Sequence, residues 1–281
     1  MKTSLTQLLV HLDATPQAAR RLEVARQIAQ AHDAAITVLY AVTPSLLDIP
    51  FVSEAGPSVA TILRALDDEH HARARAAFGQ SLESPGIHAI WAEVRGEPIM
   101  AAFAQQSLFA DLLVLGQYEP DSVQPSGVPS DFAEALMATS GKPALIIPYT
   151  VVPAAGYETV VIAWKPTREA ARAVSAAMPM LQAARQVHVV SWSGAQETIK
   201  IDGDRLTLDG YLKQRGVQAV WHRQDDEPKA FGELLLSQAF DLQADLLVMG
   251  CYGHSRAREW VLGGASRTVL RSMTLPVLMS H

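Results

Sequence analysis

The chain has 281 residues and a formal net charge of −6, and 49% of its residues are hydrophobic against 19% charged. This composition excludes a disordered chain, and an acidic balance without a Lys/Arg run argues against a nucleic-acid-binding surface. The single cysteine, Cys251, excludes an internal disulfide and a cysteine-based zinc cluster. Because no apolar run near the N-terminus is long enough for a signal peptide or a membrane span, we expect a cytoplasmic protein that binds no membrane.

The first half of the sequence alternates short apolar runs with helical patterns, as β-α-β units do. Strand-like runs occur near residues 8–12, 34–42, 111–116 and 142–148. Helices are predicted at Pro16–His32, Val59–Leu82, Ile99–Phe109 and Ser130–Ser140. The Pro-rich segment 42–58 is expected to be a surface excursion, either a lid or a packing arm. The apolar runs are nearly continuous, which is typical of parallel strands covered on both faces.

The second half repeats this order. Leu8–Ala25 aligns without a gap with Val160–Ala177, and "DLLVLG" at residues 111–116 matches "DLLVMG" at residues 245–250. Helices are predicted here at Arg168–Ala184, Asp204–Gln214, Lys229–Phe240 and Gly264–Ser272. Two copies in one order indicate two similar domains. We therefore predict domains at residues 1–151 and 152–281, joined by a segment that contains Pro and Gly.

Glycines flank a charged stretch near the C-terminus, "GCYGHSRAREWVLGGAS" at residues 250–266. Gly250 ends an apolar run, at the edge of a parallel sheet where ligands bind. Gly253, Gly263 and Gly264 follow, and glycine lets backbone N–H groups approach a ligand closely. The helix predicted from Gly264, with Ser266 in its first turn, would favour phosphate at its N-terminus. These residues leave two interpretations open: a phosphate-binding loop, or glycines that serve only a turn and a helix start.

The same stretch resembles the C-terminal signature of the universal stress protein family, G-x2-G-x9-G, which Gly250, Gly253 and Gly263 match in spacing. The resemblance extends along both halves, so the chain is similar to a tandem universal stress protein. It implies an α/β fold with two open five-stranded parallel-sheet domains, Rossmann-like and similar to adenine nucleotide alpha hydrolases, packed as a pseudo-dimer. It also implies a seam between Ala144–Pro148 and Pro276–Met279, and a homodimer of tandem chains.

The resemblance further implies a site for ATP or another adenine nucleotide, ADP or AMP, with Mg²⁺ accompanying it, in the second domain. The residues carried over to that site are Trp164, Lys165, Met249, Gly250, Tyr252, Gly253, Gly263, Gly264 and Ser266. Lys165 stands where binders carry an aspartate, and Gly264 where serine is frequent. Losing one charged contact costs about 1.5–3 kcal/mol, so weakened rather than abolished binding is expected. Trp164 is consistent with stacking on a base and equally with packing under a helix.

The first domain departs from the family pattern in the opposite sense. It keeps Asp13 after its first strand and Gly96 in "VRGEP", but Glu119 replaces the second glycine of the loop, and Pro120 and Asp121 follow. Carboxylates repel phosphate, and proline fixes a backbone that would have to adapt. No triphosphate is expected there.

Other candidate sites have commoner explanations. Cys251 and His254 suggest a metal or thiol site, yet no second cysteine accompanies them. His70 and His71, beside Asp67–Glu69, could chelate a metal, but a solvated helix face is the commoner origin of such a cluster. No nucleophile elbow or carboxylate pair stands out, so we expect at most weak ATPase activity. The sequence therefore predicts a stress-response protein that binds an adenine nucleotide, with a scaffold protein that binds none as the alternative.

Overall fold

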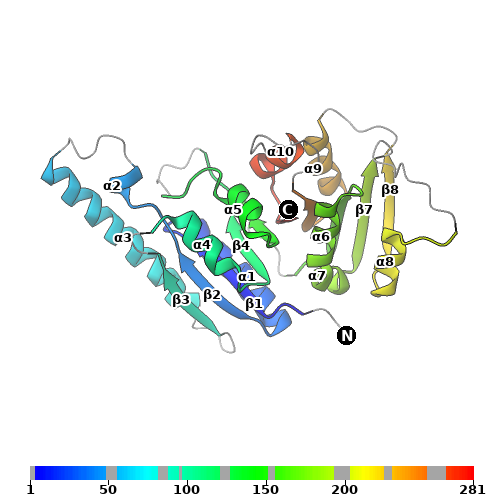
Figure 1. Ribbon diagram of the computed structural model, residues 1–281, viewed down its shortest axis with the longest axis horizontal. Coiled ribbons are helices and arrows are strands. Elements are labelled where there is room, and N and C mark those ends of the chain that lie inside the picture. The colour runs from blue at the N-terminus through cyan, green and yellow to red at the C-terminus, as the bar shows by residue number, and fades with distance from the viewer. Residues whose placement is uncertain are drawn as a thin grey trace. The chain divides into compact units, whose positions relative to one another are not determined.

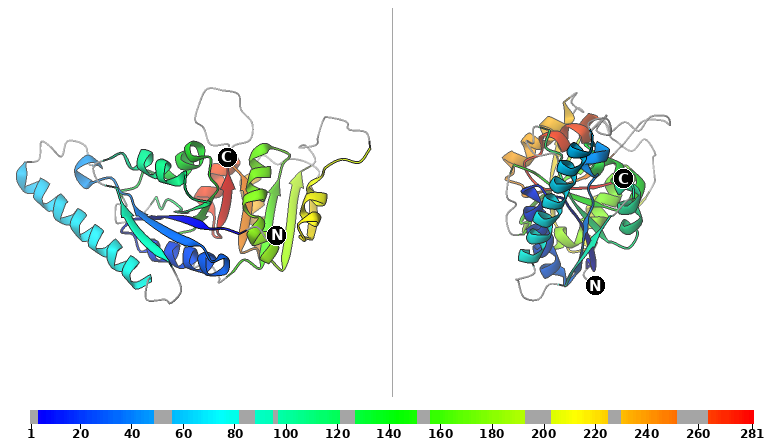
Figure 2. Two further views of the ribbon diagram at one scale, coloured as in Figure 1. Left: turned by 60° about the horizontal axis from the view of Figure 1, so that its bottom comes forward. Right: turned by 90° about the vertical axis from the view of Figure 1, so that its left-hand side faces the viewer.

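The computed structural model describes residues 4–48, 56–81, 88–94, 97–120, 127–150, 156–192, 203–224, 230–251 and 264–281. By its internal contacts the chain divides into two compact units, Leu5–Lys142 and Pro143–His281, the second of which also includes Ser4. In each unit helices lie on both faces of a sheet (Figures 1 and 2). No helix among these described residues is long and apolar enough to cross a membrane.

The first unit contains four parallel strands in the order β3-β2-β1-β4. The strands are β1 (Gln7–Leu12), β2 (Ala35–Tyr40), β3 (Ala89–Glu93) and β4 (Leu112–Gly116), and the helices are α1 (Gln17–His32), α2 (Ser45–Asp48), α3 (Pro57–Ser81), α4 (Ile99–Ser107) and α5 (Phe132–Ser140). Helix α1 packs against α3, and α4 packs against α5. The central strands are consequently buried on both faces, as Val10 and Val114 illustrate.

The second unit contains six strands in the order β5-β10-β9-β6-β7-β8. The strands are β5 (Ala144–Ile147), β6 (Thr159–Trp164), β7 (Gln186–Trp192), β8 (Ala219–Gln224), β9 (Leu246–Gly250) and β10 (Val277–Ser280), and the helices are α6 (Arg168–Ala176), α7 (Met178–Ala183), α8 (Leu208–Gln214), α9 (Phe231–Asp241) and α10 (Gly264–Ser272). Strand β5 runs antiparallel to β10, with Leu145 opposite Leu278, and the other pairs are parallel. The strand pairing expected between Ala144–Pro148 and Pro276–Met279 is confirmed, as is the α/β fold.

The division by contacts falls after Lys142, one element earlier than the domain boundary predicted from the repeat. The cause is strand β5, which closes the first repeat in sequence but pairs with β10. The domain limits 1–151 and 152–281 stay a prediction, and residues 151–155 around them lie outside the described residues.

Most helices begin and end close to the predicted residues, with three differences. The helix predicted at Arg168–Ala184 is two helices, α6 and α7, because Pro179 has no N–H with which to continue the first one. Helix α8 begins only at Leu208, where the Thr207 hydroxyl accepts a hydrogen bond from the Gly210 N–H at 3.1 Å. The Pro-rich excursion contains the short helix α2, and its residues 49–55 lie outside the described part of the chain.

One carboxylate has the same role in both units. Asp111, just before β4, accepts a hydrogen bond at Oδ2 from the Thr6 N–H at 2.8 Å. Asp245, just before β9, accepts hydrogen bonds at Oδ2 from the Glu158 N–H at 2.8 Å and the Thr159 N–H at 3.2 Å. Each carboxylate thereby ties the start of the first strand of its repeat, β1 or β6, to the neighbouring strand. The internal repeat therefore extends from the sequence to the hydrogen bonds of the fold.

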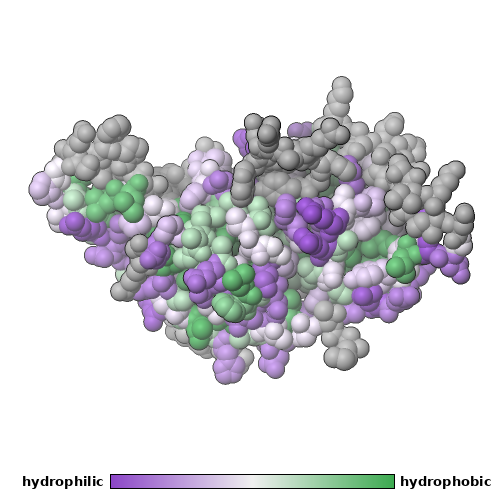
Figure 3. All heavy atoms as spheres, viewed as in Figure 1, coloured by the Kyte–Doolittle hydropathy of each residue, from purple (hydrophilic) through white to green (hydrophobic). Residues whose placement is uncertain are grey.

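Exposed apolar side chains are scattered among polar ones on the face shown in Figure 3. A hydrophobic group lies over α2 and the first turns of α3, where Leu47 and Ile62 are exposed. Isolated exposed apolar residues are ordinary for a folded chain.

Candidate functional site

The order of the strands in the second unit creates a crevice beside β6. The chain leaves β6 toward β7 on one side and later returns to β9 on the other. Parallel sheets bind ligands at the carboxyl ends of their strands where the order reverses in this way. Ala163 of β6 lies opposite Met249 of β9, so Trp164 and Lys165 follow beside Gly250. The strand register thus brings four predicted site residues together at the point where the strand order reverses.

The remaining predicted residues belong to the segment after β9. Gly264 begins α10 and Ser266 lies in its first turn, as predicted. A Cβ on Gly264 would meet no atom within 4 Å, so a side chain would fit at this position. Ser266 is buried, with 4% of its surface exposed. Tyr252, Gly253 and Gly263, which would form the centre of the phosphate loop, lie outside the described residues.

Packing alone explains one of the glycines. A Cβ on Gly250 would lie 2.6 Å from the Ala170 nitrogen and 2.9 Å from the Glu169 carbonyl carbon, both in the first turn of α6. These distances are shorter than any side chain tolerates, so the end of β9 and the start of α6 touch backbone to backbone. Gly250 therefore has a structural role whether or not a ligand binds. Its packing is compatible both with a phosphate-binding loop and with a glycine that serves the fold alone.

The corresponding crevice of the first unit is filled by its own side chains. Asp13, which aligns with Lys165, is buried and pairs with Arg21 of α1, whose Nη2 lies 2.7 Å from Oδ1. The contact is ionic, because Nη2 is not directed at the carboxylate as a hydrogen-bond donor. Arg21 Nε donates a hydrogen bond to the His11 carbonyl oxygen at 3.1 Å. The guanidinium lies against Gly116 at the end of β4, where a Cβ would clash with it.

Charges inside this filled crevice are balanced internally. Burial alone would raise the pKa of Asp13, but the charge of Arg21 and hydrogen bonds from Thr15 outweigh it and lower that pKa. Burial lowers the pKa of the neighbouring His11 to about 4, so this imidazole is neutral at pH 7. Its Nε2, 2.8 Å from the Ala41 carbonyl oxygen, donates the hydrogen bond between them. The ion pair and the neutral histidine leave this corner without a charge to offer a ligand.

The second glycine position of the first unit is also occupied by an internal contact. Gln17 Nε2 donates a hydrogen bond to Glu119 Oε2 at 2.8 Å, at the place where the family loop has glycine. In the second unit, alanine (Ala173) aligns with Arg21, so no guanidinium reaches the crevice from that position. Gly96, which the first domain keeps, and Asp121, which departs from the family pattern, lie outside the described residues.

Two of the candidate metal residues, His71 and Cys251, have a structural environment that accounts for them without a metal. His71 Nε2 lies 2.7 Å from Glu93 Oε2, and its ring packs against Tyr40. Cys251 is buried and reduced, and His254 lies outside the described residues. Within the described ranges, no group of three or more His, Cys, Asp or Glu side chains could hold a metal ion.

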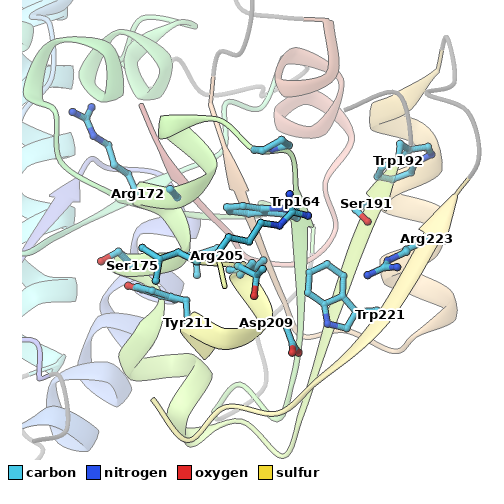
Figure 4. A pocket seen from close by; sticks show the side chains of 16 residues that line it. Trp164, Arg172, Ser175, Ser191, Trp192, Arg205, Asp209, Tyr211, Trp221 and Arg223 are labelled. Carbon is cyan, nitrogen blue, oxygen red and sulfur yellow. The ribbon is translucent and has the colours of Figure 1, made fainter. Parts of the chain in front are cut away.

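A cavity of ≈ 1190 Å³ opens on the face of the second unit's sheet that carries α6 and α8 (Figure 4). Adjacent strands place Trp164, Ser191 and Arg223 in a row on its floor, because Ser191 lies opposite both of the others. Trp221 precedes Arg223 by two residues and faces the same way. Side chains from α6 and from residues 205–211 form the walls, among them Arg172, Ser175, Arg205, Asp209 and Tyr211. Of these residues only Trp164 was expected from the sequence.

Tandem repeats, parallel strands joined by helices and a reversal of strand order beside β6 define a Rossmann-like α/β protein. Residues 156–281 match the model of the Universal stress protein family. The two-unit arrangement is consistent with a tandem member of that family.

Two crystal structures are similar over nearly the whole chain. The first is a universal stress protein from Archaeoglobus fulgidus DSM 4304, with a TM-score of 0.67, 16% identity and 97% of each chain covered. The second is a functionally unknown protein from Pseudomonas aeruginosa PAO1, with a TM-score of 0.58, 14% identity, and 98% of this chain and 92% of that chain covered. No curated protein sequence matches the chain. At these identities the likeness shows the fold.

Proposed function

We propose that the protein binds an adenine nucleotide (ATP, ADP or AMP, with Mg²⁺ accompanying it) in its second domain. The proposed contacts are Trp164, Lys165, Met249, Gly250, Tyr252, Gly253, Gly263, Gly264 and Ser266. The role proposed is a stress response in the cytoplasm by a homodimer of tandem chains, with little or no catalysis. The first domain supports the second structurally and binds no nucleotide.

One observation carries this proposal. Trp164–Lys165 and Met249–Gly250 end adjacent parallel strands at the point where the strand order reverses, within the segment that matches the family. Helix α10 is the next described element after β9 in the chain and begins at Gly264, and helix N-termini attract phosphate. The contrast with the first unit adds support, since Arg21 fills that crevice from within.

The alternative is a scaffold protein that binds no nucleotide. The close packing of Gly250 on α6 favours it, because that glycine is needed for the fold alone. Lys165 favours it too, since the family's binders carry an aspartate there. The two functions differ in whether the purified protein should contain a bound nucleotide.

The first test is to denature freshly purified protein and identify the released small molecules by mass spectrometry. About one adenine nucleotide per chain is the expected result. Calorimetric titration with Mg-ATP then compares the wild type with Gly263→Val, which should lose binding while its melting stays cooperative. Gly79→Val is the matched control, because Gly79 lies on a helix of the first unit with no atom within 4 Å of its Cβ position. No released nucleotide together with no heat at millimolar Mg-ATP, or unchanged affinity in Gly263→Val, would contradict the proposal.

A further inference from the structure

The two units pack the same face of their sheets differently. In the first unit Tyr40 of β2 stacks on Trp91 of β3, with ring centroids 5.7 Å apart and an interplanar angle of 17°. The equivalent positions of the second unit are Ser191 and Trp221. The second unit therefore keeps the tryptophan and lacks the aromatic ring that covers it.

This equivalence follows from the strand register and not from a loose superposition. Leu12 aligns with Trp164 in the ungapped repeat. Leu12 lies opposite Tyr40 on the next strand, and Trp164 lies opposite Ser191. Since side chains alternate between the two faces of a sheet, these positions share a face in both units.

The covering helix differs as well. Helix α3 has 25 residues and brings the rings of His71 and Phe78 to 5.8 Å and 5.4 Å from Trp91. Helix α8 has seven residues, and at the corresponding place it lines the cavity with Tyr211. The cavity thus lies where the first unit has a long helix and a tyrosine ring.

The charge at one aligned position differs in sign between the two units. Arg223 occupies the position of Glu93, since the two lie opposite Ser191 and Tyr40 respectively. Arg205 and a further arginine on α6 join it in the lining. Among the described lining residues the one acidic side chain is Asp209, which is paired with Lys213 at 2.7 Å. The arginine on α6, Arg172, donates a hydrogen bond to the His281 carbonyl oxygen at 2.8 Å. The positive charge of Arg205 and Arg223 beside an already paired carboxylate favours an anionic ligand.

We propose that this cavity binds a planar aromatic anion, whose ring lies on Trp221 where the Tyr40 ring lies on Trp91, and whose acidic group is held by Arg223 and Arg205. Trp221 is half-buried, and the Arg223 guanidinium lies over its ring, 5.5 Å from the centroid, so one ligand can contact both side chains. Aromatic rings stack in an offset geometry on an indole, and guanidinium groups pair with carboxylate or phosphate oxygens in a planar geometry. Nucleotides and aromatic acids share this chemistry. The inference does not rest on the proposed nucleotide function: neither Gly250 nor Gly264 lines the cavity, and among the described residues Trp164 alone is common to both sites.

Calorimetry on the full chain tests the ligand class with two pairs of probes. AMP and 2-naphthoate are aromatic anions, and adenosine and 2-naphthamide are their neutral counterparts. We expect at least one anion to bind one per chain, about tenfold or more tightly than its neutral counterpart. Binding of AMP alone would assign the cavity to nucleotides, and binding of 2-naphthoate alone to aromatic acids. No binding of either anion at millimolar concentration, or equal affinity for a neutral counterpart, would overturn the proposal.

Two variants locate the bound probe. Ser191→Tyr supplies the ring present in the first unit and should abolish binding. Arg223→Gln should weaken binding about ten- to a hundredfold by removing a charge-assisted contact. Arg185→Gln, an exposed arginine paired with Glu158 away from the cavity, is the control and should leave the affinity unchanged.

Unchanged affinity in both Ser191→Tyr and Arg223→Gln, with cooperative melting, would overturn the site. Gly263→Val separates the two proposals. It should abolish Mg-ATP binding at the glycine loop and leave the binding of 2-naphthoate intact.

Discussion

Arg21 and Asp13 form an ion pair that the fold encloses almost completely, with side chains 4% and 6% exposed and Nη2 2.7 Å from Oδ1. The guanidinium reaches from α1 into the crevice at the carboxyl ends of β1 and β4 and lies against Gly116. A ligand could enter this crevice only by displacing a buried charge from its partner. The two repeats have therefore diverged into one unit with a crevice closed from within and one that lacks this closure.

Removing one partner of this pair should be costly. Arg21→Met leaves the Asp13 carboxylate buried without a countercharge, and we expect the free energy of unfolding in urea to fall by about 3–5 kcal/mol. Arg26→Met on the same helix is the matched control. Its partner Glu23 has 45% of its side chain exposed to solvent, so the loss there should stay below about 1 kcal/mol. The double variant Asp13→Leu/Arg21→Met should recover most of the stability, and equal losses in the two single variants would contradict the assigned role.

Stability should fall in mild acid because of His11. Its pKa is about 4 in the folded protein because of burial, against an ordinary value of 6.5. Between these values the unfolded chain binds more protons than the folded one, so protonation favours unfolding. The contribution is full above pH 6.5 and is lost as the pH falls toward 4, a change of about 3 kcal/mol.

The check is urea unfolding between pH 7.5 and pH 4.5 for the wild type and for His11→Gln, which keeps a hydrogen-bond donor for the Ala41 carbonyl oxygen. The variant should show a flatter dependence on pH in this window. The contribution of Asp13, whose pKa is lowered, is lost only at still lower pH. Identical slopes for the two proteins would exclude His11 as the source.

Adding one methyl group at Gly250 should disturb the second unit. Gly250→Ala forces the ends of β9 and α6 apart, and we expect a loss of about 1–3 kcal/mol, measured as a lower midpoint of unfolding. Gly264→Ala places the same methyl group in open space at the start of α10 and should change stability by less than about 0.5 kcal/mol. A neutral Gly250→Ala would show that the two backbones separate easily.

The carboxylate of Asp111 should matter more than its partly exposed position suggests. It accepts hydrogen bonds from the Thr6 N–H, the Thr6 hydroxyl and the Gln7 N–H, and these contacts lower its pKa. Asp111→Ala leaves those donors without this acceptor, and a loss of about 1–3 kcal/mol is expected in urea unfolding. Asp131→Ala is the control, because Asp131 makes no capping hydrogen bond to α5. Comparable losses in the two variants would contradict the tie between the strands.

Much of the fold could be predicted because most of its helices and strands have recognisable local sequence patterns. The buried central strands are continuous apolar runs, and α10 begins at the predicted Gly264. The outer strands β3 and β8 were not delimited, because they lie at the ends of the strand order and carry exposed residues such as Ile90 and Val220. An outer strand is covered less completely, so its sequence lacks the continuous apolar pattern.

The candidate site was predicted only in part, for a different reason. Trp164 and Gly250 could be found because each ends a recognisable strand of a family pattern. The closure of the first crevice depends on Arg21 reaching across a helix turn to Asp13, which spacing alone does not reveal. The cavity exists because the small Ser191 occupies the position of Tyr40 in the first unit. That the two positions are equivalent can be seen only from the strand register. Sequence patterns mark residues that are present more readily than space that is left unfilled.

The antiparallel pairing of β5 with β10 bears on what would happen if the halves were separated. A fragment beginning after Ile147 would retain β10 but lose β5, and the backbone N–H and C=O groups of Val277, Leu278 and Met279 that face β5 would have no partner strand. Exposed apolar edges recruit other strands, and the nearest complementary strand would be β10 of another fragment. The last strand of the first repeat therefore covers the edge of β10. Because this strand belongs to the same chain, the edge is not available for pairing with β10 of another molecule.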